Sequence, residues 1–307
     1  MRLDTVFAVP PLPRKIDPRR TIDLDASEAV ARHIEAGGIT HLLYGGNAFL
    51  YHATEEDFDT LVEWLAAMPE PRVPIPSIGP SFGRAVDQAR VLNRRRFAAA
   101  MMLPCGDPRD AKGLEAGYRE IAQVAGMPLI IYLKSEDAFG SDRAAGLDAI
   151  GRLIDDGVAI AIKYAVVLQD PTADDYLGAL LWRVANTRIV SGMGERPAIV
   201  HLKDFKLAGM TTGSGCIAPR TCRSFYESCH RGDWAAAERL RAEFIPLEDL
   251  RDAWGPARVL HHATTCAGIA GTGPIPPYVS PLSEGQLTQL APLARGLREL
   301  DGQWVAQ

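Results

Sequence analysis

The chain has 307 residues, 47% of them hydrophobic, and a formal net charge of -5, so it is long enough to bury a large core. That charge provides no basic excess for binding nucleic acid or an anionic membrane surface. The sequence has no apolar stretch of membrane-spanning length and no leader-like start, and its five cysteines form no CxxC pair typical of a metal site. We therefore expect a cytoplasmic protein with reduced thiols, no nucleic-acid partner and no membrane partner.

Short apolar segments alternate with amphipathic segments along the first two thirds of the chain. Apolar residues at every position or every second position predict strands, and apolar residues at intervals of three and four predict helices. The predicted strands are 5–9, 39–44, 72–78, 97–103, 127–133, 158–165, 187–192 and 205–210.

Start and stop signals place helices between these strands. Asp25, with Glu28 three residues later, predicts the start of the first helix, and Gly37 predicts its end. Thr54 and Asp57 predict the start of the second. Further starts are predicted at Asp107 with Pro108, at Thr172 with Asp175, and at Ser283.

Eight strands at a spacing of roughly thirty residues favour a closed parallel (β/α)8 TIM barrel within the α/β class. The first strand is not followed by a glycine-rich dinucleotide motif, which argues against an open doubly wound sheet. The periodicity after the last strand predicts helices over 219–254 and 281–300. We expect a barrel over 1–218 and a C-terminal helical extension over 219–307 that packs on it as a single functional unit.

The most informative residue is Lys163, which stands in the apolar segment GVAIAIKYAVV. Strand alternation predicts that Ala159, Ala161 and Lys163 face the barrel interior, while Ile160 and the other alternate residues face the helices. Lys163 then lies at the carboxyl end of the barrel, where active sites of this fold are built. Burial among apolar groups favours the neutral amine, which can attack a carbonyl carbon and form a Schiff base. The alternative is a lysine that reaches solvent or pairs with a carboxylate.

The preceding strand predicts a partner for that lysine. Ile130 and Tyr132 alternate in the same way, so Tyr132 should stand at the height of Lys163 on the neighbouring strand, about 4.8 Å away. A phenol beside an imine-forming amine can act as general acid and base. The alternative is an ordinary core tyrosine whose hydroxyl is hydrogen bonded.

The chain resembles the dihydrodipicolinate synthase and N-acetylneuraminate lyase superfamily over nearly its whole length. The segments that carry the resemblance are LLYGGNAFLYHATEEDF, MMLPCGDPRDAKGL, MPLIIYLKSED, VAIAIKYA, IVSGMGE, MTTGSGCIAPR and PPYVSPLSEGQL. The resemblance implies a class I barrel enzyme with its imine on Lys163 and its tyrosine at Tyr132. It also implies that the loop containing Gly215 and Cys216 lines the pyruvyl pocket. No cofactor is implied, and the family's usual assembly is a homotetramer built from dimers, so we expect a homotetramer or homodimer.

One departure from the family pattern concerns the turn after the second strand. The family usually carries Gly-Thr-Thr-Gly-Glu there, and its threonine hydroxyl and backbone amides hold the substrate carboxylate. This chain has Leu43, Tyr44, Gly45, Gly46 and Asn47 at that place. We expect these residues to bind the carboxylate through backbone N–H groups and the Asn47 amide, although a plain turn is the alternative.

Two further departures argue against the lysine-pathway synthase itself. Cys105 and Gly106 stand where the synthases have two tyrosines, one of which completes a proton relay in a neighbouring active site. The arginine that binds the second substrate in the synthases is also missing, and Asp137 stands near its place. Lys134 in the same loop could bind an acidic substrate instead.

The resulting hypothesis is a class I aldolase or dehydratase acting on pyruvate or a 2-keto-3-deoxy sugar acid, with no metal ion. The absence of an HxH or HExxH pattern agrees with a metal-free reaction. One alternative is a family member that binds a keto acid without turnover. A weaker alternative is a metal-dependent or phosphate-binding barrel enzyme that uses the glycine-rich GMTTGSG segment.

Overall fold

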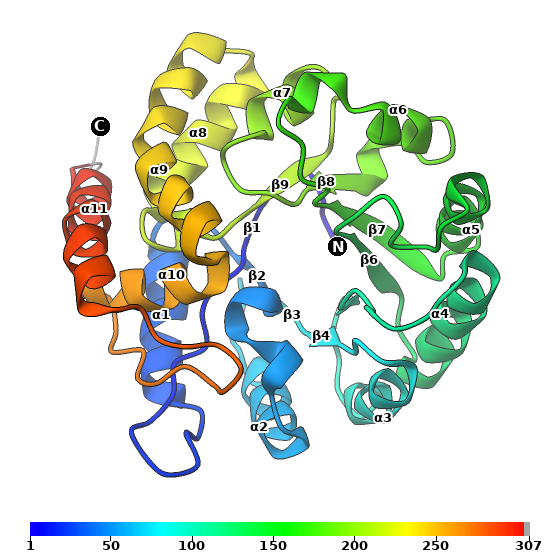
Figure 1. Cartoon of the computed structure of the whole chain (residues 1–307), viewed down its shortest axis with the longest axis horizontal. Coiled ribbons are helices and arrows are strands. Elements are labelled where there is room, and N and C mark those ends of the chain that lie inside the picture. The colour runs from blue at the N-terminus through cyan, green and yellow to red at the C-terminus, as the bar shows by residue number, and fades with distance from the viewer. Residues whose placement is uncertain (304–307) are drawn as a thin grey trace.

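The computed structural model describes residues 1–303 and contains a closed parallel barrel with helices around it (Figure 1). Its strands follow the order β3-β2-β1-β9-β8-β7-β6-β5-β4, and every pairing is parallel. The strands are β1 Val6–Ala8, β2 His41–Leu43, β3 Val73–Ile75, β4 Ser77–Ile78, β5 Ala100–Met102, β6 Leu129–Leu133, β7 Ala159–Tyr164, β8 Ile189–Ser191 and β9 Gly209–Thr212. The predicted (β/α)8 barrel is confirmed.

Two of these strands are halves of one barrel strand, which explains why nine segments make an eight-stranded barrel. The predicted strand 72–78 is interrupted at Pro76, which has no N–H group to donate. Its first half, β3, pairs with β2, and its second half, β4, pairs with β5. The Pro76 carbonyl still accepts a hydrogen bond from the Met101 N–H at 2.9 Å, so the barrel remains closed across the break.

Helices surround the barrel and continue into the C-terminal part of the chain. The α-helices are α1 Leu24–Ala36, α2 Glu55–Ala66, α3 Phe82–Leu92, α4 Ala111–Ala125, α5 Arg143–Asp155, α6 Asp175–Leu181, α7 Ala198–Lys203, α8 Pro219–Arg231, α9 Trp234–Trp254, α10 Pro256–Cys266 and α11 Glu284–Gly302. Short 3-10 turns are η1 Gly46–Ala48, η2 Leu50–His52, η3 Pro171–Ala173, η4 Asn186–Arg188 and η5 Ser214–Cys216. None of the helices within residues 1–303 has the length and apolar character that crossing a membrane requires.

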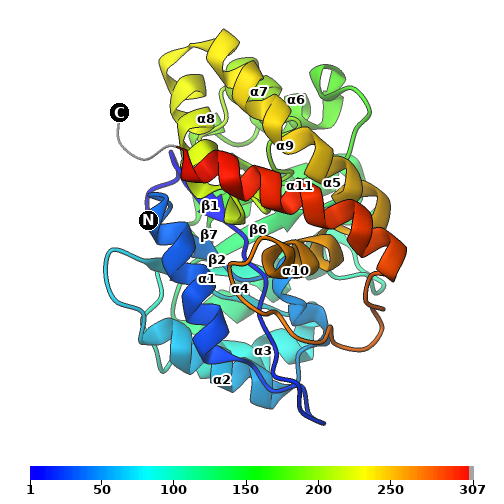
Figure 2. The same ribbon diagram turned by 90° about the vertical axis from the view of Figure 1, so that its left-hand side faces the viewer.

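The C-terminal helices pack together on one side of the barrel, next to α1 (Figures 1 and 2). Helix α8 contacts α1 and α7 as well as α9, so it joins the barrel's helix ring to the extension. Helices α9, α10 and α11 contact one another, and α10 also contacts η1 in the turn after β2. The extension thereby reaches the carboxyl end of the barrel.

Several predicted boundaries are wrong by a few residues. Helix α1 is capped by Asp23 rather than Asp25, and α4 is capped by Asp110 rather than by Asp107 with Pro108. In each case another aspartate nearby accepts the first free backbone N–H, and either choice fits the sequence pattern. The last strand is 209–212 rather than 205–210, because α7 and its terminal turn extend to Lys206, whose φ is +56°. The capping boxes at Thr54 and Ser283 are as predicted.

A β-bulge changes the predicted alternation in β7. Leu129 pairs with Ala159, but Ile130 pairs with Ala161, so Ile160 has no partner across the ladder. Ala159 therefore belongs to the apolar layer between barrel and helices. Ile160 instead packs against the cluster that contains Ile130 and Ala161. The prediction that Ala159 faces the interior is wrong. The bulge precedes Ala161 and Lys163, whose alternation is regular.

Candidate functional site

The carboxyl ends of the barrel strands open into a cavity of about 1480 Å³. Residues that end or follow the strands form its floor, namely Val9, Leu43, Tyr132, Lys163, Gly192 and Gly213. Its wall includes residues of α9 and of the loop after α10, among them Arg251, Trp254 and Tyr278. The C-terminal extension therefore supplies part of the same cavity that the barrel strands supply.

Lys163 and Tyr132 lie next to each other in this cavity. The two residues are direct partners in the β6–β7 ladder, and the Lys163 amine lies 3.7 Å from the centroid of the Tyr132 ring. Lys163 is only 6% exposed. The pairing of β6 with β7 therefore places the amine over the tyrosine ring at the cavity floor.

The surroundings shift the pKa of both groups. Burial lowers the pKa of Lys163 below its ordinary value, because an ammonium group loses its hydration in the apolar barrel. Burial alone raises the pKa of the Tyr132 phenol, but the positive charges of Lys163 and Lys134 lower it by more. The pair therefore has the properties of an amine nucleophile beside a proton-transferring phenol.

Gly192 keeps space beside the lysine. A Cβ atom at Gly192 would lie 2.6 Å from the Tyr164 carbonyl oxygen and 2.9 Å from Lys163 Cγ. Such contacts are too short for any side chain, so only glycine allows β8 to pass this close to Lys163. The sequence analysis missed Gly192. Its place at the end of a predicted strand next to the lysine strand was the available signal.

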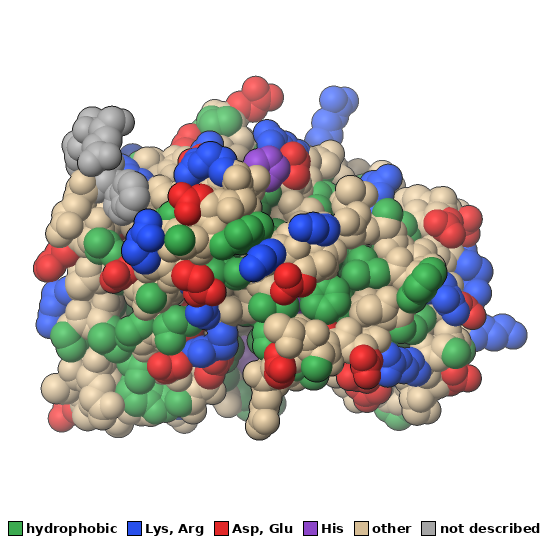
Figure 3. All heavy atoms as spheres, turned by 90° about the horizontal axis from the view of Figure 1, so that it is seen from above, with side chains coloured by type: hydrophobic (Ala, Val, Ile, Leu, Met, Phe, Trp, Pro, Cys, Tyr) green, Lys and Arg blue, Asp and Glu red, His purple; other side chains and the backbone are tan. Residues whose placement is uncertain are grey.

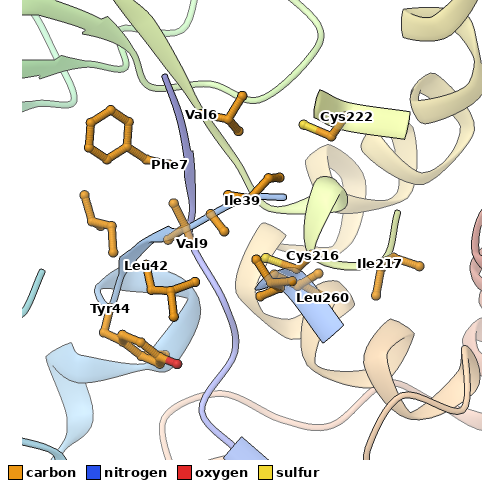
Figure 4. Close-up of a cluster of buried hydrophobic side chains, with 14 of the residues drawn as sticks. Val6, Phe7, Val9, Ile39, Leu42, Tyr44, Cys216, Ile217, Cys222 and Leu260 are labelled. Atoms are coloured by element: carbon orange, nitrogen blue, oxygen red, sulfur yellow. The ribbon is translucent and has the colours of Figure 1, made fainter. Parts of the chain in front are cut away.

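The turn after β2 divides between the cavity and the core. Gly46 and Asn47 line the cavity, and Asn47 donates a hydrogen bond from its side chain to the Val9 carbonyl at 2.7 Å. Gly45 is buried close to Met101 and Ser77 at the barrel wall. Tyr44 is fully buried and packs edge-on against Trp64. Figure 4 shows Tyr44 within a cluster of buried apolar side chains. Strand alternation gives the reason, because its neighbour Leu43 faces the cavity.

The loop after β9 is divided in a similar way. Gly213 lines the cavity, but Gly215 and Cys216 are buried beneath it. Cys216 lies in an apolar cluster with Ile217 and Leu260 (Figure 4). The Gly215 N–H donates to the Thr212 hydroxyl at 2.7 Å, which fixes the loop internally.

A buried polar cluster of Ser214, Glu248 and Arg251 borders the cavity and was not found from the sequence. Arg251 Nη1 lies 2.6 Å from Glu248 Oε1 and 3.3 Å from the Ser214 hydroxyl, which itself donates to Glu248. Glu248 and Arg251 belong to α9, while Ser214 follows β9. Glu248 and Arg251 are three residues apart, a spacing that predicts an ion pair on one face of a helix. The sequence pattern does not indicate that this pair points into the barrel mouth.

The sequence also differs from the family pattern at Cys105, Gly106 and the loop containing Lys134 and Asp137, and only one of these four residues lines the cavity. Lys134 lines it, whereas Asp137 is exposed and pairs with Arg109 at 3.4 Å. Gly106 is exposed, and Cys105 is half-buried outside the cavity lining. Tyr51, from the turn after β2, is a further lining residue that the sequence analysis missed. Tyr51 and Tyr132 lie in the same cavity.

Within residues 1–303, His, Cys, Asp and Glu side chains form no group suited to hold a metal ion. The five cysteines are free, as predicted. On the face seen in Figure 3, acidic and basic side chains are intermixed.

Comparison with known proteins reveals both sequence and fold similarity. No protein-family model matches the chain. The 4-hydroxy-tetrahydrodipicolinate synthase of Afipia carboxidovorans is 25% identical over 205 residues, which cover 63% of this chain and 64% of that protein. The chain thus spans less than two thirds of the curated relative.

Solved structures match the fold over almost the full length. Dihydrodipicolinate synthase from Oceanobacillus iheyensis superposes with a TM-score of 0.83 and 21% identity over 97% of both chains. Proteus mirabilis N-acetylneuraminate lyase superposes with a TM-score of 0.78 and 16% identity, over 97% of this chain and 99% of that one. The chain is therefore similar over part of its sequence to a 4-hydroxy-tetrahydrodipicolinate synthase, and it shares the barrel fold of dihydrodipicolinate synthase and N-acetylneuraminate lyase.

Proposed function

We propose that this protein is a class I lyase, an aldolase or dehydratase, that forms an imine between Lys163 and a 2-keto acid. The observation that carries the proposal is a buried lysine amine 3.7 Å from the centroid of a tyrosine ring, at the floor of a cavity large enough for a sugar acid. The relationship to synthases and lyases agrees with this chemistry.

The proposed reaction begins with attack of the neutral Lys163 amine on the keto carbon. Tyr132 moves a proton from nitrogen to oxygen, giving a carbinolamine, and then protonates the departing hydroxyl so that water leaves. In aldol cleavage the resulting iminium accepts the electron pair of the carbon–carbon bond that breaks, and the other fragment leaves as a carbonyl compound. In dehydration it accepts the pair of the C3–H bond as that proton is removed, and the enamine so formed expels the C4 hydroxyl group, which is protonated and leaves as water. We assign the carboxylate of the keto acid to the backbone amides around Gly46 and to Asn47.

The altered turn motivates a second candidate, a keto-acid-binding protein without turnover. Residues 43–47 differ from the family's Gly-Thr-Thr-Gly-Glu turn, and Cys105 and Gly106 stand in place of the tyrosines of the relay. A phosphate-binding enzyme has less support, because donors of the loop after β9 are already used. Ser214 donates to Glu248, and the Gly215 N–H donates to Thr212. Assembly as a homotetramer or homodimer stays a prediction.

Borohydride trapping tests the imine. Protein incubated with pyruvate or a 2-keto-3-deoxy sugar acid and then reduced should carry a stable adduct, which intact mass and peptide mapping would locate on Lys163. The Lys163→Ala variant should give no adduct. Lys134→Ala, which removes the other lysine lining the cavity, should keep it.

The alternatives give different results in the same experiment. Keto-acid binding in a titration, without an adduct and without product, would favour the binding protein over the lyase. An adduct on Lys134 that survives Lys163→Ala would contradict the assignment of the nucleophile.

A further inference from the structure

The Arg251 guanidinium is held at the cavity wall by contacts that use only part of it. Its Nη1 group donates to Glu248 and Ser214, and its Nε group lies 3.4 Å from the Pro256 carbonyl. Within residues 1–303, Nη2 donates to no protein acceptor. The residue is only 6% exposed and lines the cavity. A buried arginine with a free N–H group facing a cavity is suited to bind an anion.

Glycine at position 213 allows this placement. A Cβ atom at Gly213 would lie 2.2 Å from Arg251 Nη2, so any side chain would displace the guanidinium. Gly213 also lines the cavity. The free end of Arg251 therefore lies against the loop after β9, inside the barrel mouth rather than on the outer surface.

Nearby carboxylates at the rim are paired with other arginines. Asp249 and Asp252 both contact Arg196, at 2.6 and 3.2 Å, and Glu238 contacts Arg241 at 2.8 Å. Glu248 faces Nη1 of Arg251 rather than Nη2. None of these rim acids pairs with Nη2 of Arg251.

Arg251 and Lys163 border the same space at different strands. Lys163 belongs to β7, and Gly213 follows β9, with β8 and Gly192 between them. Two strand spacings correspond to roughly 10 Å. Because Gly192 and Gly213 have no side chains, neither residue blocks the space between the Lys163 amine and the Arg251 guanidinium. The turn at Gly46 and Asn47 follows β2, on the other side of β9 and β1.

We propose that Arg251 binds a second carboxylate of the substrate, so that the protein acts on 2-keto acids with an anionic group at each end. This inference rests on the proposed imine at Lys163, which fixes the keto carbon. The carboxylate next to the keto carbon lies at the turn formed by Gly46 and Asn47. The distal carboxylate accepts a charge-assisted hydrogen bond from Nη2 of Arg251.

Binding of matched ligands tests the inference separately from catalysis. Titration calorimetry would compare 2-oxoglutarate with 2-oxopentanoate, in which a methyl group replaces the distal carboxylate. The wild-type protein should bind 2-oxoglutarate about tenfold or more tightly, which corresponds to ~1.4 kcal/mol. Arg251→Gln should lose that preference while its affinity for 2-oxopentanoate stays the same. Arg196→Gln, which removes a rim arginine paired with two aspartates, should keep the preference.

Arg251→Lys provides a second variant if Arg251→Gln does not fold. It keeps the charge but replaces the three nitrogens of the guanidinium fork with one, so a single nitrogen must serve both Glu248 and the substrate, and it should lose most of the preference. Equal wild-type affinities for the two ligands, or a preference that survives in the folded Arg251 variant, would overturn the inference, as would failure of both ligands to bind. Trapping with pyruvate, a monocarboxylate, reports on the imine alone. An adduct with pyruvate but no preference for 2-oxoglutarate would reject Arg251 and retain the lyase.

Discussion

At the scale of single residues, the position of Lys163 combines a cost in stability with a gain in reactivity. An ammonium group in a buried site loses hydration, and the lowered pKa of Lys163 measures that loss. The same shift increases the fraction of neutral amine at physiological pH, which the proposed imine formation requires. Residues that favour function over stability in this way are typical of active sites.

Replacement of Lys163 by methionine should therefore stabilise the protein at neutral pH. Between the lowered folded pKa and the unfolded value of 10.5, the unfolded chain binds more protons, so wild-type stability rises with pH. Methionine removes this dependence. We expect a gain of about 1 kcal/mol or more in urea unfolding at neutral pH, shrinking as the pH approaches 10.5. A gain that is the same at both pH values would contradict a buried, perturbed lysine, and Lys134→Met serves as the exposed control.

At the scale of elements, one aspartate connects helix α6 to strand β7, which carries Lys163. The Asp174 carboxylate caps α6 by accepting the Leu177 N–H at 2.8 Å, and it also accepts the Tyr164 hydroxyl at 2.7 Å. Tyr164 follows Lys163 in β7 and is fully buried. The cap of one helix thus also satisfies a core hydroxyl directly behind the lysine strand.

Loss of this aspartate should cost more than loss of an ordinary cap. Asp110→Ala removes a cap on the exposed end of α4, which accepts only the Gly113 N–H, and should cost about 1 kcal/mol. Asp174→Ala also leaves the buried Tyr164 hydroxyl without its partner, and should cost about 3 kcal/mol. Urea unfolding of both variants measures the difference. Equal losses would mean that the Tyr164 contact adds nothing, and Asp174→Ala combined with Tyr164→Phe should recover part of the loss.

At the scale of the whole molecule, the barrel and the C-terminal helices meet at a buried carboxyl group. Glu195 follows β8 and accepts hydrogen bonds from Thr212 of β9 at 2.5 Å and from Cys222 of α8 at 3.4 Å. Burial, together with the nearby Glu248 carboxylate, raises the pKa of Glu195 from 4.5 to about 7. The junction therefore contains a carboxyl group that gains or loses its proton near neutral pH.

Removing the charge at Glu195 should change how stability depends on pH. Between pH 4.5 and about 7 the folded protein holds a proton that the unfolded chain has released, so this group lowers stability as the pH rises through that window. Glu195→Gln lacks that loss and should exceed the wild type by about 1 kcal/mol or more above neutral pH, with little difference near pH 4.5. Urea unfolding across this range measures it. Parallel curves for the two proteins would contradict the raised pKa.

Local sequence patterns are sufficient to predict the barrel and the adjacency of Tyr132 and Lys163. Eight apolar segments at regular spacing leave few ways to bury their faces, and period-two alternation puts Ile130 and Tyr132 on one side of a strand. The register that pairs Tyr132 with Lys163 matches that alternation. Alternation also separates Leu43 from Tyr44, so the burial of Tyr44 away from the cavity was readable from the same rule.

The residues that close the cavity and the departures from regular strand pairing depend on how distant segments pack together. The bulge at Ile160 has no sequence signal in an all-apolar run, because either face accepts isoleucine and alanine. The contact of Arg251 with Gly213 joins residues far apart in the chain, and local periodicity carries no information about which helix end meets which loop. Strand and helix patterns depend on neighbours in sequence, whereas the polar wall of this cavity depends on how α9 packs across the barrel mouth.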